Sequence, residues 1–402
     1  MYRCLKVDFF CDKNNLDKLF ACNRISAQIW NQCLDLANNY RTKNNGLWIS
    51  KANLFSGLKE RYPLHSQSVQ SVAESYCEAR DATKAARDIG LNTRYPWRLK
   101  GNYPTTWKSP KGFTIDYSTR TLTLKLGIYP MQQGPIKVKL SQATLDRIGS
   151  TQIKEVSLIW DNRLMLTLCL DDRQEKPEPI CSDTEAGIDL GIIHSITAFA
   201  DNGQATIITG RLLRSINRYR NKKLAEFQKL MNRCTKYSRR WKRLKCAKRR
   251  LLSKLDAQVR DITHKITRSF VRWAEANNVS KVFVGNVEGV QRNTRNGSKK
   301  KRRTKQVSQE LSNWNFGQQL NYLKYKLEAV GIRLSKISEA YSTQTCPVCG
   351  RRKKAKGRNY VCKCGYTAHR DIHGARNILS LGQYRNIRWI AEIQNITYLR
   401  TA

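Results

Sequence analysis

Residues 185–200 read EAGIDLGIIHSITAFA and place a carboxylate inside an otherwise apolar stretch. The pattern predicts a buried strand that enters a turn near Gly191 and continues as a second strand. A buried strand carboxylate is costly unless it is paired or binds a metal ion. Gly187 and Gly191 leave room for an ion or a phosphate to approach. Asp189 is therefore a candidate metal ligand, with an ordinary turn aspartate as the alternative.

The rest of the second half alternates between strand and helix patterns. Apolar side chains with helical spacing lie on one side of residues 258–279, namely Val259, Ile262, Ile266, Phe270 and Trp273. The remaining expected elements are a third strand over 204–210, a long basic helical stretch over 211–255, strands over 281–285 and 331–339, and helices over 313–331 and from 369. The two later strands should lie side by side and parallel. This order is typical of an RNase H-type domain.

Four cysteines gather late in the chain, and they are Cys346, Cys349, Cys362 and Cys364. Thiolate pairs at this spacing predict a closed tetrahedral site for one structural Zn²⁺ without a catalytic role. The alternatives are chance clustering and a redox dithiol. The loop between the pairs is basic, so we expect this segment to contact nucleic acid as well.

The charge of the chain indicates a polyanionic partner. Lys and Arg number 74 and Asp and Glu 31, a formal net charge of +43 over 402 residues. Nucleic acid is the usual partner of so basic a protein. Residues 211–255 contain one acid, Glu226, and residues 292–306 are basic without periodicity. We expect both segments to contact phosphates. Trp97 and Trp107 are candidates for stacking on bases, although tryptophans more often belong to cores.

The other nine cysteines are scattered singly, and no secretory signal or membrane-length apolar run is visible. We therefore expect free thiols, a reducing cytosol and no membrane partner.

The first half combines a lone strand over 2–10, helices over 14–90 and a β-rich block from 113. A helical insert thus interrupts one β domain. The expected domains are 1–10 with 111–181 (β domain), 11–110 (helical insert) and 182–402, which includes a basic arm over 211–278 and a zinc ribbon over 342–368.

A second candidate acid, Asp371, opens a helix in HRDIHGARNI directly after the cysteines. Alone it could be an acid favoured by the helix dipole. The order GIDLGI, KVFVG, CPVCG, CKCGY and HRDIHGARNI, however, resembles the C-terminal half of the TnpB family, the transposon-encoded relatives of compact type V CRISPR effectors. These motifs cover residues 187–378, whereas residues 1–180 match in layout alone.

The resemblance implies an α/β multidomain protein. A RuvC-like RNase H fold with a zinc-ribbon insertion would follow a wedge β-barrel domain that carries a helical recognition insert. It further implies a DNA endonuclease that binds two Mg²⁺ through three carboxylates. A transposon-derived or CRISPR-like guide RNA and a short flanking motif would select the double-stranded DNA target. We expect a monomer in a prokaryotic cytoplasm, associated with the nucleoid.

The chain departs from the family at the second acid. The family carries a glutamate in a V-I-E-D-L pattern, and Gly285 occupies that place here. Glu339, on the neighbouring parallel strand, is the favoured replacement, so Asp189, Glu339 and Asp371 are the expected catalytic Mg²⁺ ligands. The alternatives are Glu288 or no replacement. In the last case the protein would be a nuclease-inactive RNA-guided DNA-binding protein or repressor. A transposase proper is a third alternative.

Overall fold

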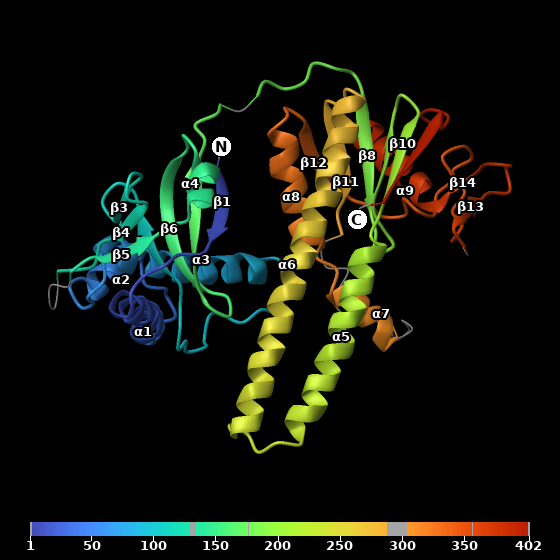
Figure 1. The fold of residues 1–402 in the computed structure, drawn as a ribbon. Coiled ribbons are helices and arrows are strands. Elements are labelled where there is room, and N and C mark those ends of the chain that lie inside the picture. The colour runs from blue at the N-terminus through green and yellow to red at the C-terminus, as the bar shows by residue number, and fades with distance from the viewer. Residues whose placement is uncertain (1, 129–133, 176, 288–303, 356, 401–402) are drawn as a thin grey trace. The chain divides into compact units, whose positions relative to one another are not determined.

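A computed structural model describes residues 2–128, 134–175, 177–287, 304–355 and 357–400. The chain divides into two compact units, Met1–Glu175 and Lys176–Ala402 (Figure 1). Glu288 and most of the basic segment 292–306 lie outside the described residues. Within the described ranges, every helix is too short or too polar to span a lipid bilayer.

Three helices of the first unit pack through apolar side chains at helical spacing. Leu19, Ile29 and Leu34 are all buried in the core of this unit, as their spacing predicts. Side chains of Asp12 and Ser50 cap the first two helices by accepting hydrogen bonds from backbone N–H groups three residues on. The helices are α1 (Lys13–Lys43), α2 (Lys51–Leu58) and α3 (Ser66–Asp88).

Two antiparallel sheets complete the first unit. The strand order is β1-β7-β6-β2 in one sheet and β3-β4-β5 in the other. The first strand thus pairs with the last one, with Tyr2 opposite Asp171. The elements are β1 (Tyr2–Val7), β2 (Thr105–Lys108), β3 (Phe113–Asp116), β4 (Thr121–Leu124), β5 (Ile136–Lys139), α4 (Gln142–Ile148), β6 (Gln152–Trp160) and β7 (Leu164–Asp171).

The two candidate stacking tryptophans of the first unit differ in exposure. Trp107 is fully buried, and its indole N–H donates to the carbonyl oxygen of Lys125 at 2.8 Å. It is a core residue, so the interpretation of Trp107 as a base-stacking side chain is wrong. Trp97 is 60% exposed and remains available.

A six-stranded mixed sheet forms the centre of the second unit, in the order β12-β11-β8-β9-β10-β15. β9 runs antiparallel to both of its neighbours, and the other neighbouring pairs are parallel. The predicted parallel pairing of 281–285 with 331–339 is confirmed. The strands are β8 (Glu185–Leu190), β9 (His194–Ala200), β10 (Gln204–Thr209), β11 (Lys281–Gly285), β12 (Arg333–Ile337) and β15 (Asn395–Leu399).

Helices cover both faces of this sheet (Figure 1). On one face, Ile188 and Val282 pack with side chains of α6 and α8, including the predicted stripe from Ile262 to Trp273. On the other face, Phe199 and Phe283 pack with α9. The helices of this unit are α5 (Arg211–Asn232), α6 (Arg239–Ala276), α7 (Lys305–Ser312), α8 (Phe316–Glu328) and α9 (Arg370–Tyr384).

α9 lies against β8 with almost no side chain between them. A Cβ on Gly187 would collide with the carbonyl oxygen of Ala375 and lie 2.5 Å from the backbone nitrogen of Leu379. A Cβ on Gly382 would likewise collide with the ring of Phe283. Glycine on both elements therefore sets how closely the helix approaches the sheet.

The basic stretch forms a helical hairpin instead of one long helix. α5 ends at Asn232 and α6 begins at Arg239, so the predicted helical stretch over 211–255 consists of two helices joined by residues 233–238. α5, all of whose residues are described, buries none of them, and the buried residues of α6 begin at Leu255. The hairpin end therefore extends from the sheet as a charged arm (Figure 1).

The contact between α9 and β8 makes Gly187→Ala a sharp test of the packing. We expect this change to lower the free energy of unfolding by about 1–3 kcal/mol, because the new methyl group meets backbone atoms that cannot move aside. Urea unfolding followed by circular dichroism measures it. Gly317→Ala is the control, since a Cβ there meets nothing within 4 Å. Equal stability of the two variants would contradict the packing.

Candidate active site

The alternation of β8 and β11 turns two predicted site positions toward α9. Ile188 and Leu190 pack with α6 and α8, so Asp189 between them faces the opposite side. Val284 likewise packs with α6 and α8, which leaves Gly285 on the α9 side. Both positions lie where parallel strands end, the usual place for sites on open α/β sheets.

Glu339 fills the space above Gly285. It follows β12, whose residue Ile337 pairs with Gly285. A Cβ built on Gly285 would lie 2.6 Å from Oε2 of Glu339 and 3.0 Å from its Cβ. The missing side chain of Gly285 therefore provides the room that the glutamate from the neighbouring strand occupies. Glu288 is not among the described residues, so its alternative role stays a hypothesis.

Asp371 enters from the first turn of α9. In the next turn, a Cβ on Gly374 would lie 2.7 Å from Oδ2 of Asp189. The start of α9 therefore passes directly over the Asp189 carboxylate.

Asp371 and Glu339 lie close enough to act on the carboxylate of Asp189. The pKa of Asp189 is raised well above its usual range, first by burial and then by the negative charges of Asp371 and Glu339, with Arg370 opposing. Burial also raises the pKa of Glu339. Such a cluster needs bound protons or a cation to neutralise it. The structure thus brings together the three acids that the sequence predicts.

Two histidines that the sequence reasoning missed lie beside Asp371. Nε2 of the buried His194 is 3.9 Å from Oδ2 of Asp371. Ligand atoms of His194, His369 and Asp371 all lie within 4.8 Å of one another, so these residues could hold an ion. Within the described part of the chain, the three carboxylates do not form a group that tight. The available signal was sequence proximity, because His194 follows Asp189 by five residues and His369 precedes Asp371 by two.

A basic cavity adjoins these histidines. Its volume is about 460 Å³, and its lining is Ile193, Arg211, Arg214, Ser215, Arg218 and Arg358. Arg358 donates a hydrogen bond of 2.9 Å to Nε2 of His194. Arg214 is paired with Glu310 at 2.9 Å. The cavity therefore offers guanidinium groups for a phosphate next to the carboxylates.

The four late cysteines form a second cluster. The sulfurs of Cys346 and Cys364 are 3.6 Å apart, and those of Cys349 and Cys362 are 3.5 Å apart. All four are free thiols whose sulfurs lie within 4.8 Å of one another. A backbone hydrogen bond from Cys364 helps to lower the pKa of Cys362 to about 6. The predicted grouping of these cysteines is confirmed, and thiolates so arranged suit a soft or borderline metal ion.

Buried polar contacts fix the cysteine segment to α9. Nδ2 of Asn377 donates to the backbone oxygens of Ser342 at 2.6 Å and Thr345 at 2.7 Å. The ring of Tyr360 stacks on that of His373, with centroids 3.9 Å apart. The segment also carries the short antiparallel strands β13 (Asn359–Val361) and β14 (Thr367–His369). These contacts fix the position of the first turn of α9, which carries Asp371.

Two family models match parts of this chain. Residues 168–291 match the family described as "Probable transposase", and residues 316–378 match "Cas12f1-like, TNB domain". The first range contains Asp189, and the second contains Glu339 and Asp371.

A solved structure supports the same fold. The chain superposes on the structure described as "Cryo-EM structure of the Cas12f1-sgRNA-target DNA complex" with a TM-score of 0.64. The match covers 91% of this chain and 83% of that one at 14% identity. At this identity the likeness concerns the fold alone. The protein is thus an α/β multidomain protein with the fold of the compact type V effectors.

Curated relatives give the family. The chain is 29% identical over 192 residues to the Escherichia coli (strain K12) protein named "Putative RNA-guided DNA endonuclease InsQ". It is 25% identical over 199 residues to TnpB-like protein L79 of Acanthamoeba polyphaga mimivirus. The alignments cover 44% and 49% of this chain, and 46% and 37% of the two relatives. These relatives and the two family matches support a TnpB-family protein. The chain spans less than half the length of either relative.

The Asn377 contacts lead to a stability prediction. Asn377→Ala leaves two buried carbonyl groups without their donor, so we expect the free energy of unfolding to fall by about 2–4 kcal/mol. Asn232→Ala, at an exposed position of α5, is the matched control and should change it by less than about 0.5 kcal/mol. Denaturant titration of both variants gives the comparison. A stability loss no greater than the control's would show that the contacts do not hold the segment.

Proposed function

We propose that the protein is an RNA-guided DNA endonuclease that hydrolyses phosphodiester bonds with divalent metal ions held by Asp189, Glu339 and Asp371. The observation that carries the proposal is the position of Glu339 over Gly285, beside the other two acids. Glu339 supplies a third carboxylate, although Gly285 occupies the place of the family's glutamate. The strand order β10-β9-β8-β11-β12, with β9 antiparallel, supports assigning this unit to the RuvC-like RNase H folds.

The donor set fits Mg²⁺. Three oxygen-donating carboxylates suit a hard divalent cation. A bound cation would offset the repulsion between their negative charges. Two bound Mg²⁺ ions would activate water and stabilise the leaving oxygen. Asp189, Glu339 and Asp371 would hold them. Arg370, whose charge opposes the raised pKa of Asp189, limits the net negative charge of the site.

The chain's own residues would position the strand to be cut. The arginine cavity beside His194 would hold a backbone phosphate by charge-assisted hydrogen bonds. The exposed α5–α6 hairpin would follow the backbone of a nucleic-acid duplex, since 211–255 contains a single acid. Sequence would be selected by base pairing with a guide RNA and by a short flanking motif on the DNA.

The name of the InsQ relative and the RNA and DNA in the Cas12f1 complex support the choice of partners. We propose a wedge β-barrel domain from 1–10 and 111–181, a helical recognition insert over 11–110 and a nuclease domain over 182–402. The last includes the basic arm over 211–278 and the ribbon over 342–368. A monomer acting on a prokaryotic nucleoid in the cytoplasm fits these roles.

We further propose one structural Zn²⁺ in the cysteine cluster. A Zn–S bond of about 2.3 Å in a tetrahedron places neighbouring sulfurs about 3.8 Å apart. The observed separations of 3.6 Å and 3.5 Å are close to that value. They are also far longer than a disulfide bond of about 2.05 Å. A site closed by four thiolates leaves no position for substrate.

The placement of Glu339 predicts both a loss and a rescue of activity. We expect Glu339→Ala to reduce cleavage of matched plasmid by about 100-fold or more, because outer-shell residues alone cost metal sites about 10–100-fold. Adding Gly285→Glu in the same chain should restore part of the activity, since the vacated space lies directly beside the Cβ position of residue 285. The measurement uses guide-loaded protein with Mg²⁺.

Two controls make the rescue specific. Gly285→Ala together with Glu339→Ala should stay inactive, because the methyl group brings no carboxylate. DNA binding, measured in parallel, should remain unchanged in all variants. Full cleavage by Glu339→Ala would overturn the assignment of Glu339. Binding of matched DNA by the unaltered protein with no cleavage would instead support the nuclease-inactive alternative.

The zinc proposal predicts about one tightly held zinc per chain by elemental analysis. We expect Cys349→Ser to lower the zinc content and the Tm, because one of four thiolate ligands is lost. Cys246→Ser, at an exposed free thiol outside the cluster, should change neither. A metal-free protein with an unchanged Tm would refute the site.

A further inference from the structure

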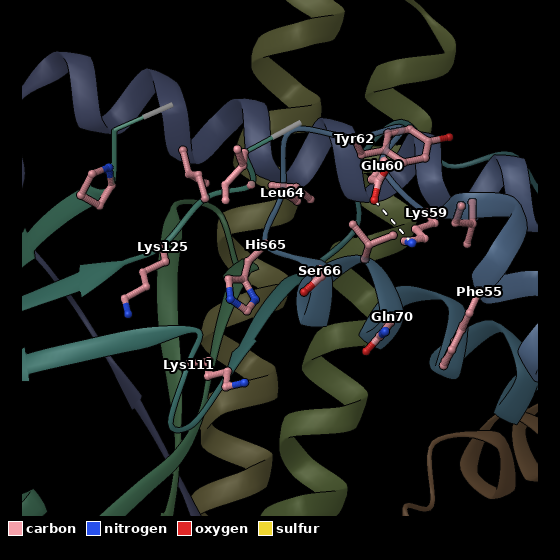
Figure 2. A pocket seen from close by; sticks show the side chains of 16 residues that line it. Phe55, Lys59, Glu60, Tyr62, Leu64, His65, Ser66, Gln70, Lys111 and Lys125 are labelled. Carbon is pink, nitrogen blue, oxygen red and sulfur yellow. Dashed lines mark ion pairs between the residues drawn. The ribbon is translucent and has the colours of Figure 1, made fainter. Parts of the chain in front are cut away.

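The first unit contains a large cavity that the proposed chemistry does not use (Figure 2). Its volume is about 750 Å³, within the range of small-molecule sites. It lies between the end of α2, the start of α3 and the segment that follows β4. The residues that line it include Phe55, Tyr62, His65, Gln70, Lys111 and Lys125.

Backbone contacts fix the walls of this cavity. Leu64 and Leu126 form an antiparallel bridge between the two sides. A Cβ on Gly127 would collide with the carbonyl oxygen of Leu64, so only glycine allows this approach. Backbone contacts of the unit therefore define the shape of the cavity.

The lining has two chemically different parts. Phe55 and Tyr62 lie toward one end in Figure 2, whereas Lys111 and Lys125 lie toward the other with His65. Aliphatic side chains, including Leu58 and Val69, also line the cavity. The cavity thus combines an aromatic and apolar end with a cationic end.

The cationic end has little negative charge to balance it. Among the described lining residues Glu60 is the one acid, and it lies 3.5 Å from Nζ of Lys59. The pKa of His65 is lowered, first by burial and then by the charges of Lys125 and Lys111. The field at this end is therefore positive and suits an anion.

We propose that this cavity takes one unstacked nucleotide of the guide RNA. A purely apolar ligand would leave the lysines without partners, and a simple anion would not use the aromatic end. A nucleotide has a flat base for Phe55 and Tyr62 and a phosphate for Lys111 and Lys125. Ser66 and Gln70, both exposed at the cavity, can bond the 2′-hydroxyl or a base edge.

RNA is favoured over DNA for a physical reason. Single-stranded RNA loops and ends present bases that are already unstacked, whereas a duplex DNA base must first leave its stack and its pair. The inference rests on the proposed function, because it assumes that a guide RNA is bound.

Crosslinking tests the occupant directly. The protein is purified with its RNA, irradiated at 254 nm, digested and examined by mass spectrometry, with and without matched target DNA. We expect a ribonucleotide on the peptide that contains Phe55 and Tyr62. A deoxyribonucleotide there, appearing when DNA is added, would overturn the RNA assignment. Crosslinks confined to other peptides would overturn the cavity as a nucleotide site.

Affinity measurements give an independent test with the same copurified RNA sequence, transcribed in vitro. We expect Tyr62→Ala to weaken binding by about 10-fold through lost stacking, and Tyr62→Phe to retain it. Lys111→Ala with Lys125→Ala should reduce the salt dependence of binding by about one to two phosphate contacts. Tyr117→Ala, at an exposed tyrosine outside the cavity, is the control.

A second aromatic variant distinguishes a loss of stacking from a loss of folding. Phe55→Leu keeps apolar volume and removes the stacking face, so it should weaken RNA binding without a change in Tm. Wild-type affinity in Tyr62→Ala, Phe55→Leu and the lysine pair would reject the cavity while leaving the proposed function intact. A protein that neither copurifies with RNA nor binds any would reject both.

Discussion

The close packing of α9 on β8 is the constraint on which the second unit depends. Glycine at position 187 lets the helix backbone approach the sheet, and Gly374 lets it pass beside Asp189. A helix that stayed a side chain's width away would move Asp371 out of the field of Asp189. The same packing closes the core around Phe283 and Ala375. One contact therefore determines both the stability of this unit and the geometry of its carboxylates.

This geometry brings three acids together at one place in a strongly basic chain. Burial and the negative charges of Asp371 and Glu339 raise the proton affinity of Asp189, so the buried charge of Asp189 destabilises the fold unless a proton or cation binds there. The apolar core and the hydrogen bonds of Asn377 hold the elements together against that repulsion. The positive charge of Arg370 partly offsets the negative charge around Asp189. Bound metal ions would neutralise the negative charge of this cluster, which makes it a candidate metal site.

Much of this unit could be predicted from the sequence, because buried strands and amphipathic helices have strong periodic signals. Lys281–Gly285 and its parallel neighbour are examples. The position of the break between α5 and α6 could not be predicted, because residues 233–238 contain no proline or glycine to mark it. β15 was missed because its side chains are mostly exposed and carry no buried alternation. His194 and His369 could not be paired from sequence, because only the fold brings β9 and the start of α9 together.

The proposed relocation of an acid from one strand to the next is compatible with sheet geometry. Adjacent strands lie about 4.8 Å apart, which a glutamate side chain nearly spans. Two positions on neighbouring parallel strands can therefore deliver a carboxylate to one point, provided that the position without the acid is small. Gly285 meets this condition, since any Cβ there would meet Glu339. The two residues thus act as one unit, and the glycine is as necessary to this arrangement as the glutamate.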